Sequence, residues 1–181
     1  MADINSAFWA SHLVEPKRSY KYKVDWDDGR TPWYLFSAVD LPKYTLGETP
    51  VHALNHTLKY PGRITWDDIT MEITDSESID AAGVLIEKLL QAGYAYPTSP
   101  NVYRTISKQG CIAAMGILRI TEMTWDERII GQWTLKNAWI KSFDSGKRSY
   151  DSDDAVKISL TVTYDWAEYS ANPEGSRPTM G

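Results

Sequence analysis

The sequence has almost no cysteine and little histidine. Its 181 residues include one cysteine, Cys111, and three histidines. One cysteine cannot form an internal disulfide, and Cys111 has no partner at the spacing of a zinc site. With so few Cys and His residues, a Cys–His or Ser–His catalytic pair is poorly supported, and the G-x-S-x-G nucleophile motif is absent. We therefore predict that Cys111 is a reduced core residue and that the chain is not an enzyme.

The sequence also lacks a long hydrophobic run and an excess of basic residues. No stretch reaches the about 18 apolar residues of a membrane-spanning helix, and residues 1–20 lack the basic start and apolar core of a secretory signal. With 19 Lys and Arg against 24 Asp and Glu, the formal net charge is −5. Electrostatic binding of nucleic acid needs clustered Lys and Arg instead. These absences predict a soluble protein that is not exported by a signal peptide and does not grip DNA.

Alternation of apolar and polar residues is the main positive signal. Side chains on a strand point to opposite faces in turn, so alternation indicates a half-buried strand. In AVKISLTVTYDW, residues 155–166, every second residue from Val156 to Trp166 is apolar. Similar patterns predict further strands, mostly antiparallel, at 20–26, 33–40, 51–60, 63–74, 114–125 and 129–141.

One helix is predicted among these strands. In SESIDAAGVLIEKLLQAGY, residues 76–94, apolar residues recur at helical spacing, Ser and Asp offer an N-cap, and Gly93 offers a stop. The proline-containing stretch 94–110 is expected to be a surface excursion rather than a linker. We therefore predict a single domain over 1–181, with a core at about 20–169, an N-terminal arm at 1–19 and a mobile tail at 170–181.

The chemical motifs fail on geometry. In YPGRITWDDITMEITD, residues 60–75, Asp67 and Asp68 would point to opposite faces of a regular strand over 63–74, so they cannot act as an acid–base pair. His52 and His56 would share a strand face but lie about 13 Å apart, too far to hold one ion together. The SGKRS turn at 145–149 lacks the earlier glycine of a phosphate-binding loop. We predict no catalytic, metal or cofactor site.

The order of the predicted elements resembles the tail tube proteins of contractile-tailed bacteriophages. A strand pair is followed by a Leu41–Pro42 step, the YPGRITWDDITMEITD stretch, the helix, a hairpin, WTLKNAWIKSFDSGKRSYDSDD and a closing strand ending in YDWAEY. The resemblance covers about residues 20–169 and rests on the order and spacing of several weak motifs. It implies that the chain belongs to the superfamily of tail tubes and injection-system tubes.

The resemblance implies a mainly β protein, an antiparallel β-sandwich or barrel of tail-tube type with one flanking α-helix. Such chains form hexameric rings that stack into a hollow tube inside the contractile sheath of the virion, and assembly takes place in the host bacterial cytoplasm. The implied partners are further copies of this chain, the sheath protein, and the baseplate and tail terminator proteins. Viral DNA would pass through the lumen during ejection without specific binding, and an acidic wall would repel its phosphates. No cofactor and no membrane contact are implied.

Two sets of assembly residues follow from the resemblance. The long polar connection after the second strand is expected to project and to reach the next ring, as a ring-stacking loop formed by Pro42, Lys43, Tyr44, Thr45, Leu46, Gly47, Glu48, Thr49 and Pro50. The inner wall is predicted to come from the strands near 33–40, 51–60, 114–125 and 129–137. Asp40, Glu122 and Lys136 are predicted to face the channel.

Two other interpretations remain open. Within the same architecture, the chain would be a tube-initiating baseplate component or a ring protein of a bacterial secretion or injection apparatus, and self-stacking into long tubes would separate these. In a different class, it would be a small β-sandwich enzyme or a carbohydrate-binding module that uses some of its eight tryptophans as sugar platforms. Such a module would be monomeric and would lose sugar binding when an exposed Trp is replaced.

Overall fold

The computed structural model describes residues 16–26, 31–99, 105–151 and 153–171. It is mainly antiparallel β, as the sequence predicts. The predicted N-terminal arm and C-terminal tail lie almost entirely outside the described residues, and the single-domain division stays a prediction. Strand β10 still includes residues 170 and 171, so the predicted tail begins too early.

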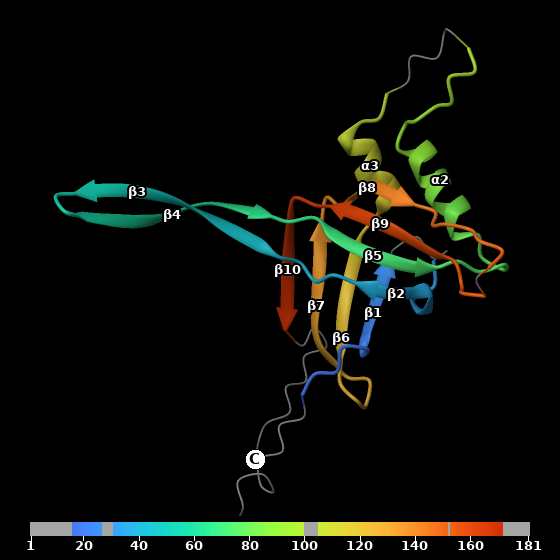
Figure 1. Ribbon diagram of the computed structural model, residues 1–181, viewed down its shortest axis with the longest axis horizontal. Coiled ribbons are helices and arrows are strands. Elements are labelled where there is room, and N and C mark those ends of the chain that lie inside the picture. The colour runs from blue at the N-terminus through green and yellow to red at the C-terminus, as the bar shows by residue number, and fades with distance from the viewer. Residues whose placement is uncertain (1–15, 27–30, 100–104, 152, 172–181) are drawn as a thin grey trace, which may run out of the picture.

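The strands form two four-stranded sheets and a separate hairpin (Figure 1). Sheet 1 has the order β1 (Tyr22–Trp26), β6 (Leu118–Met123), β7 (Ile129–Lys136), β10 (Trp166–Ala171). Sheet 2 has the order β2 (Phe36–Val39), β5 (Ile69–Thr74), β9 (Lys157–Thr163), β8 (Trp139–Asp144). The hairpin consists of β3 (Tyr44–Ala53) and β4 (His56–Trp66). The two sheets cross steeply, and the hairpin projects sideways from them.

The core lies between the inner faces of the two sheets. In β9, the alternation found in the sequence buries Ile158, Leu160 and Val162. From sheet 1, Leu118 and Ile120 of β6 are fully buried against the same cluster. Burial of such side chains stabilises the fold by about 1.5–3 kcal/mol each relative to exposure.

Two α-helices close one end of the described structure, where the sequence predicts one. The expected helix is α2 (Ala81–Gln91). The second, α3 (Lys108–Met115), falls in the predicted excursion and in the start of the predicted strand 114–125. Ser107 caps it by accepting a hydrogen bond from the Gly110 N–H at 3.0 Å, and Gly116 ends it with φ 72°. A short 3-10 helix, η2 (Trp33–Leu35), precedes β2.

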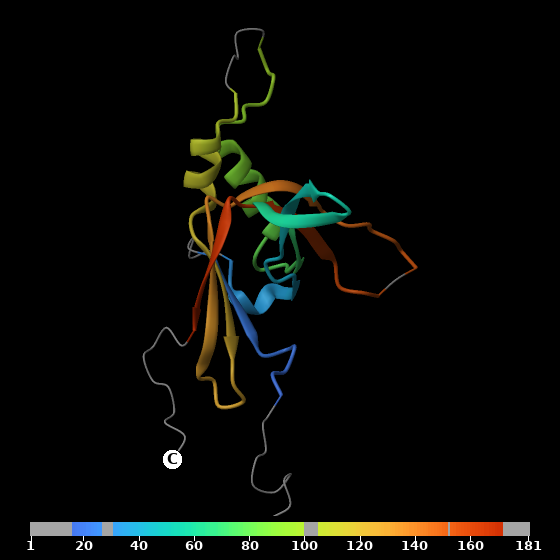
Figure 2. The same cartoon turned by 90° about the vertical axis from the view of Figure 1, so that its left-hand side faces the viewer.

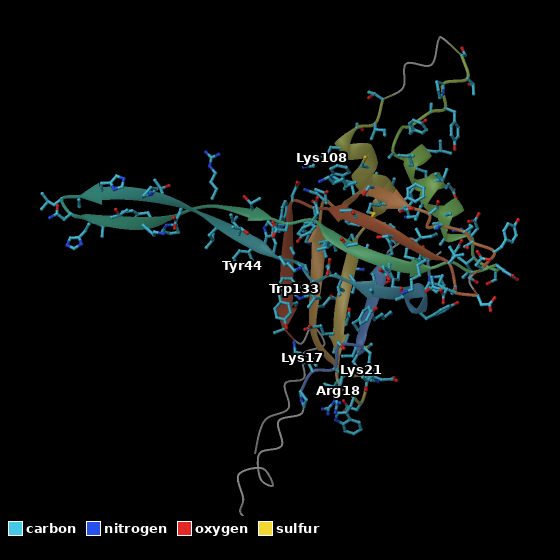
Figure 3. The ribbon with its side chains drawn as sticks, viewed as in Figure 1. Lys17, Arg18, Lys21, Tyr44, Lys108 and Trp133 are labelled. Atoms are coloured by element: carbon cyan, nitrogen blue, oxygen red, sulfur yellow. The ribbon has the colours of Figure 1, made fainter. Side chains whose placement is uncertain are left out.

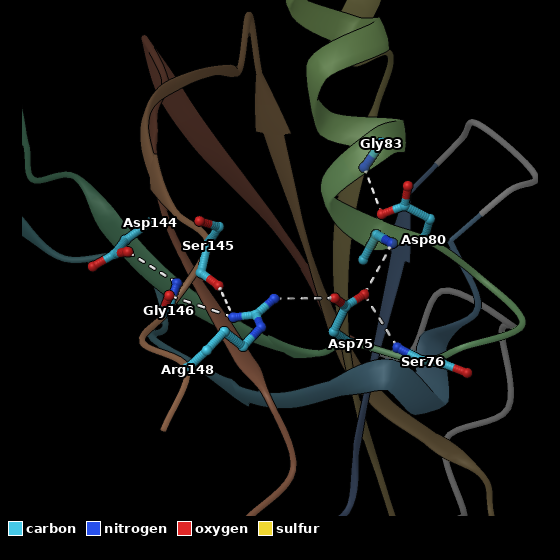
Figure 4. A network of polar contacts seen from close by, with 9 residues as sticks. Asp75, Ser76, Asp80, Gly83, Asp144, Ser145, Gly146 and Arg148 are labelled. Atoms are coloured by element: carbon cyan, nitrogen blue, oxygen red, sulfur yellow. Dashed lines mark hydrogen bonds and ion pairs between the residues drawn. The ribbon is translucent and has the colours of Figure 1, made fainter. Parts of the chain in front are cut away.

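A polar network fixes the start of α2 (Figure 4). Asp80 accepts a hydrogen bond from the Gly83 N–H at 2.9 Å, and Asp75 accepts one from the Ala81 N–H at 3.2 Å. The Arg148 guanidinium lies 3.7 Å from the Asp75 carboxylate and donates at 2.7 Å to a carbonyl of its own turn. The basic 145–149 turn therefore braces the helix start.

Four predicted strands are broken where the chain turns or changes sheet. The chain reverses after residue 53 inside the expected 51–60 strand, and it breaks at 67–68 inside the expected 63–74 strand. A residue with φ 56°, Asn137, ends β7 and sends the chain from sheet 1 to sheet 2. After β9 the chain crosses back from sheet 2 to sheet 1, as the two red strands of Figure 2 show. Trp166 therefore lies in sheet 1, is 43% exposed, and does not continue the row of core residues of β9. Alternation alone does not register such breaks.

Replacing Leu160, which is 1% exposed in central strand β9, tests the position of the core. We expect Leu160→Ala to lower the free energy of unfolding by about 2–5 kcal/mol, because it removes buried methyl groups and leaves a cavity. The neighbouring Ser159→Ala should change it by about 0.5 kcal/mol or less. Urea unfolding of the two variants measures this difference, and equal destabilisation would contradict the assigned face.

Candidate assembly surfaces

The β3–β4 hairpin, residues 44–66, is the most exposed element of the structure. Every residue of β3 is exposed, as is every residue of β4 except Trp66. Its exposed apolar side chains are Tyr44, Leu46, Val51, Leu54, Leu58, Tyr60 and Ile64. A two-stranded hairpin without support is only marginally stable in water, and an exposed apolar surface of this kind is typical of an interaction site. We call residues 44–66 the arm.

The predicted ring-stacking loop at Pro42–Pro50 is for the most part strand β3 of this arm. The prediction that the segment projects agrees with the structure, but the segment is not an irregular loop. Gly47 lies within the register shift between Leu46 and Glu48. Gly62 of the paired strand approaches so closely there that a Cβ on it would lie 3.0 Å from the Gly47 carbonyl oxygen. The two glycines allow a β-bulge at this point, and the strand pairing resumes beyond it as far as the tip of the arm.

Three aromatic rings join the arm to the body. Tyr44 at the root of the arm (Figure 3) packs on Trp66 at a centroid distance of 5.4 Å, and Trp66 packs on Tyr164 at 6.0 Å. Burial raises the pKa of Tyr164 to about 12, because the phenolate would lose its hydration. The Asp67 N–H also donates to the Lys43 carbonyl at 3.0 Å. The root is therefore packed and hydrogen-bonded although the arm itself is exposed.

Asp68 clamps the segment where the arm leads into sheet 2. Its Oδ2 lies 2.6 Å from Lys141 Nζ of β8, and its Oδ1 accepts a hydrogen bond from the Thr163 hydroxyl of β9 at 2.8 Å. The hydrogen bond from Lys141, followed by that from Thr163, lowers the pKa of Asp68. The chain breaks at residues 67 and 68, so the expected regular strand over 63–74 is wrong, and Asp68 serves to position strands.

The outer face of sheet 1 is polar. The strand register places five charged side chains on this face, namely Lys23, Asp25, Arg119, Lys136 and Glu168. Most of these charges have an opposite charge nearby: Arg119 lies opposite Asp25, and Lys136 Nζ lies 3.1 Å from Glu168 Oε2. The face is mixed in charge rather than acidic.

The structure separates the three residues predicted to face the channel. Lys136 lies on the outer face of sheet 1, whereas Glu122 is on the opposite face with Leu118 and Ile120 and forms an ion pair with Lys17 at 2.6 Å. Asp40 follows β2 of sheet 2, where its N–H bonds the Thr70 carbonyl at 2.9 Å. The four strands predicted for the inner wall also do not form one sheet, because β2 belongs to sheet 2 and residues 51–60 belong to the arm.

Among the described residues, sheet 1 has two free edges, β1 and β10. All its pairs are antiparallel, so strand direction alternates across the sheet, and β10 and β1 run in opposite directions. A second copy placed edge to edge would therefore continue the antiparallel pattern. On the core side of the β10 edge, Tyr169 packs on Trp133 at 4.8 Å, and a Cβ on Gly131 would overlap the Tyr169 hydroxyl.

Within the described part of the chain, no group of three or more His, Cys, Asp or Glu side chains is arranged to hold a metal ion. His52 and His56 do not share a strand face as predicted. They lie on the two strands of the arm, opposite Thr57 and Ala53 respectively, and so on opposite faces. No helix among the described residues is long and apolar enough to cross a membrane.

Solved structures with this architecture come from contractile injection systems. A chain of the sheath/tube terminator of PVC, an extracellular contractile injection system, has a TM-score of 0.65 at 16% identity over 88% of this chain and 100% of that chain. A chain of the anti-feeding prophage cap, described as tube terminating, has a TM-score of 0.64 at 15% identity over 86% and 91%. A chain of the PVC sheath–tube complex has a TM-score of 0.61 at 17% identity over 88% and 94%.

The chain shares the fold of these injection-system chains. No protein-family profile and no curated protein matches its sequence. This fold agrees with the resemblance in the sequence to tail tubes and injection-system tubes, and it directs attention to the arm, the edges of sheet 1 and its polar face. Sequence reasoning located the arm but missed the two edge strands as a pair, because β1 and β10 lie at the two ends of the chain.

The Asp68 clamp predicts a specific dependence on pH. Because the folded-state pKa lies below the ordinary value of 3.8, the carboxylate contributes stability above that pH, and this is lost as pH falls through the folded pKa. We expect Asp68→Asn to lower the melting temperature at pH 7, and the difference from the parent to shrink as pH falls below about 4. Thermal unfolding across this range, beside Asp67→Asn as a control, measures it. A difference that stays constant in acid would argue against the clamp.

Proposed function

We propose that the chain is a structural tube protein whose copies close into rings and whose rings stack into a tube. The observation that carries this proposal is the alternating direction of the four strands of sheet 1, with an unpaired edge on each side. Pairing of β10 with β1 of the next copy is heterologous, and a heterologous contact that closes forms a ring without free edges. The resemblance implies six copies, which would give a closed barrel of about 24 strands.

The polar face of sheet 1 would then line the lumen. Two of its three cations, Arg119 and Lys136, lie beside Asp25 and Glu168, so Lys23 carries the one charge in excess and the face offers little net attraction to a phosphate backbone. A face with nearly balanced charges suits a conduit through which a polymer such as viral DNA passes without specific binding. This differs from the acidic wall expected from the net charge, but it serves the same purpose.

The arm would cover neighbouring copies. It projects past β10, the edge to which the next copy would add (Figure 1). Its exposed apolar side chains, such as Leu54 at 103% exposure, would be buried on the outer surface of that copy or of the adjoining ring. We propose that this contact fixes ring stacking, with the sheath, the baseplate and the terminator as further partners in the virion or injection particle.

A second candidate function is supported by the comparisons. Two similar chains come from terminating assemblies, the PVC terminator and the anti-feeding prophage cap, and one comes from a baseplate. The chain would then form a single ring at one end of a tube. Electron microscopy of the purified protein separates the two functions, because a main tube protein extends into long tubes at high concentration and a terminator does not.

Ring closure is tested by cross-linking the two edges. In a Cys111→Ser background, Lys23→Cys on β1 and Ser170→Cys on β10 place one thiol at each edge on the outer face of sheet 1. A flexible bis-maleimide should give a ladder of cross-linked chains in denaturing gels that ends at the ring size. Each single variant should give dimers at most. A double variant that also stops at dimers would contradict head-to-tail edge pairing.

Shortening the arm tests its role in stacking. Replacing residues 47–63 by Asn-Gly joins the paired residues Leu46 and Ile64 through a two-residue turn. We expect melting within a few degrees of the parent, because the deleted residues are exposed, with folded subunits or single rings but no long tubes. Glu48→Gln removes only the exposed ion pair with Lys59 and should keep tubes. Electron micrographs at equal concentration decide, and long tubes from the shortened chain would show that the arm is dispensable.

A further inference from the structure

The turn between β6 and β7 presents an exposed tryptophan on a rigid support. Trp125 is 74% exposed. Beside it, Asp126 accepts hydrogen bonds from the Thr124 hydroxyl and from Arg128 Nε, the latter at 2.6 Å, and the Thr124 N–H donates to the Arg128 carbonyl at 2.8 Å. An aromatic side chain on a preorganised turn loses little entropy on binding, and Trp is a frequent anchor of interfaces. We call residues 124–128 the end turn.

A cavity lies between α2, α3 and β8. Its volume is about 290 Å³, and its walls are mostly apolar, with Leu85, Leu89, Ile106 and Phe143 among the lining residues. This is at or below the lower limit of small-molecule sites, which span roughly 300–1,000 Å³. The cavity therefore suits one large side chain better than a cofactor. We call it the helix pocket.

The end turn and the helix pocket lie at opposite ends of sheet 1. Helix α3 ends at Met115 just before β6 begins, and the end turn follows the last residue of β6. The six residues of β6 separate the two ends by about 20 Å. In Figures 1 and 2 the helices and the end turn are aligned along the strand direction. Copies stacked along that direction bring the end turn of one copy to the helices of the next.

The local charges of the two surfaces are complementary. The charged residues that line the helix pocket are Lys88 and Lys141, and none of its lining residues is acidic, although Lys141 already pairs with Asp68. The end turn carries two acids, Asp126 and Glu127, against one base, and the pairing of Arg128 with Asp126 leaves Glu127 as its net charge. Lys88 Nζ already lies 4.7 Å from the centroid of a tryptophan ring in the core, so the pocket wall places an ammonium group beside aromatic surface.

We propose that Trp125 of each copy enters the helix pocket of the copy stacked against it. The occupant of the pocket is a second copy of this chain, and the contact is head-to-tail. This inference rests on the proposed function, because it requires rings that stack. It adds to the arm a second stacking contact, at the inner layer of the tube.

Trp125→Ala is compared with Trp125→Phe, which keeps an aromatic ring. Trp125 is exposed in the single chain, so both variants should melt like the parent. We expect Trp125→Ala to form rings but to raise the concentration needed for tube growth at least about tenfold, and Trp125→Phe to recover most of the loss. Cys111 lines the pocket and reports its occupancy. Its reaction with a small maleimide should be slow in parent tubes and fast in single rings.

A cross-link identifies the partner surfaces directly. In Trp125→Cys, a short bis-maleimide should join the introduced thiol to the native Cys111 of another chain, as mapped by mass spectrometry of the peptides. The same variant with Cys111→Ser is the control and cannot give that link. If the parent forms neither rings nor tubes, the proposed function fails and this contact fails with it. If Trp125→Ala forms tubes at the parent's concentration, and Cys111 reacts equally fast in tubes and rings, this contact alone is wrong.

Discussion

The unpaired edges of sheet 1 are the constraint from which the rest of the assembly follows. A backbone N–H or C=O at a strand edge needs a hydrogen-bond partner, and water supplies it only while the edge stays exposed. Because β1 and β10 run in opposite directions, the same backbone groups that pair strands within the chain can pair them between chains. In the proposed ring, closure would satisfy both edges of every copy with one repeated contact.

Backbone hydrogen bonds alone would not fix the register in which β10 of one copy pairs with β1 of the next. In the proposed ring, side chains would fix it. A shift of one residue would move every side chain of the edge strand to the other face. The core side of β1 carries the bulky Tyr22, Val24 and Trp26, whereas its outer side is polar. At β10 the ring of Tyr169 lies over Gly131, where a Cβ would collide with it. The packing of these edge residues therefore favours one register, and the mixed charges of the outer face reinforce it.

Much of the fold was readable from the sequence, but the breaks were not. Alternation in residues 156–164 correctly predicted a buried strand, and helical spacing predicted α2. Helix α3 was missed because its eight residues bury only Met115, although Ser107 and Gly116 are recognisable boundary signals. The chain changes sheet at Asn137, which has a positive φ. The alternation of apolar and polar residues does not predict this change. The projection of the arm was predictable, because it depends on residues that are close together in the sequence. Asp40, Glu122 and Lys136 could not be assigned to faces, because that needs the pairing of distant strands.

The division between backbone and side-chain contacts also explains how the fold persists at low identity. Main-chain hydrogen bonds between strands use groups that every residue possesses, so chains of 15–17% identity can share the architecture of the sheets. In the proposed ring, closure through the strand edges would use the same groups. Stacking of one ring on another could not use backbone hydrogen bonds between strand edges, because turns and helices occupy the ends of the strands. In the proposed tube, stacking would depend on particular side chains, namely the apolar residues of the arm and Trp125 of the end turn. Differences in sequence should therefore alter which rings stack on which before they alter whether a ring forms.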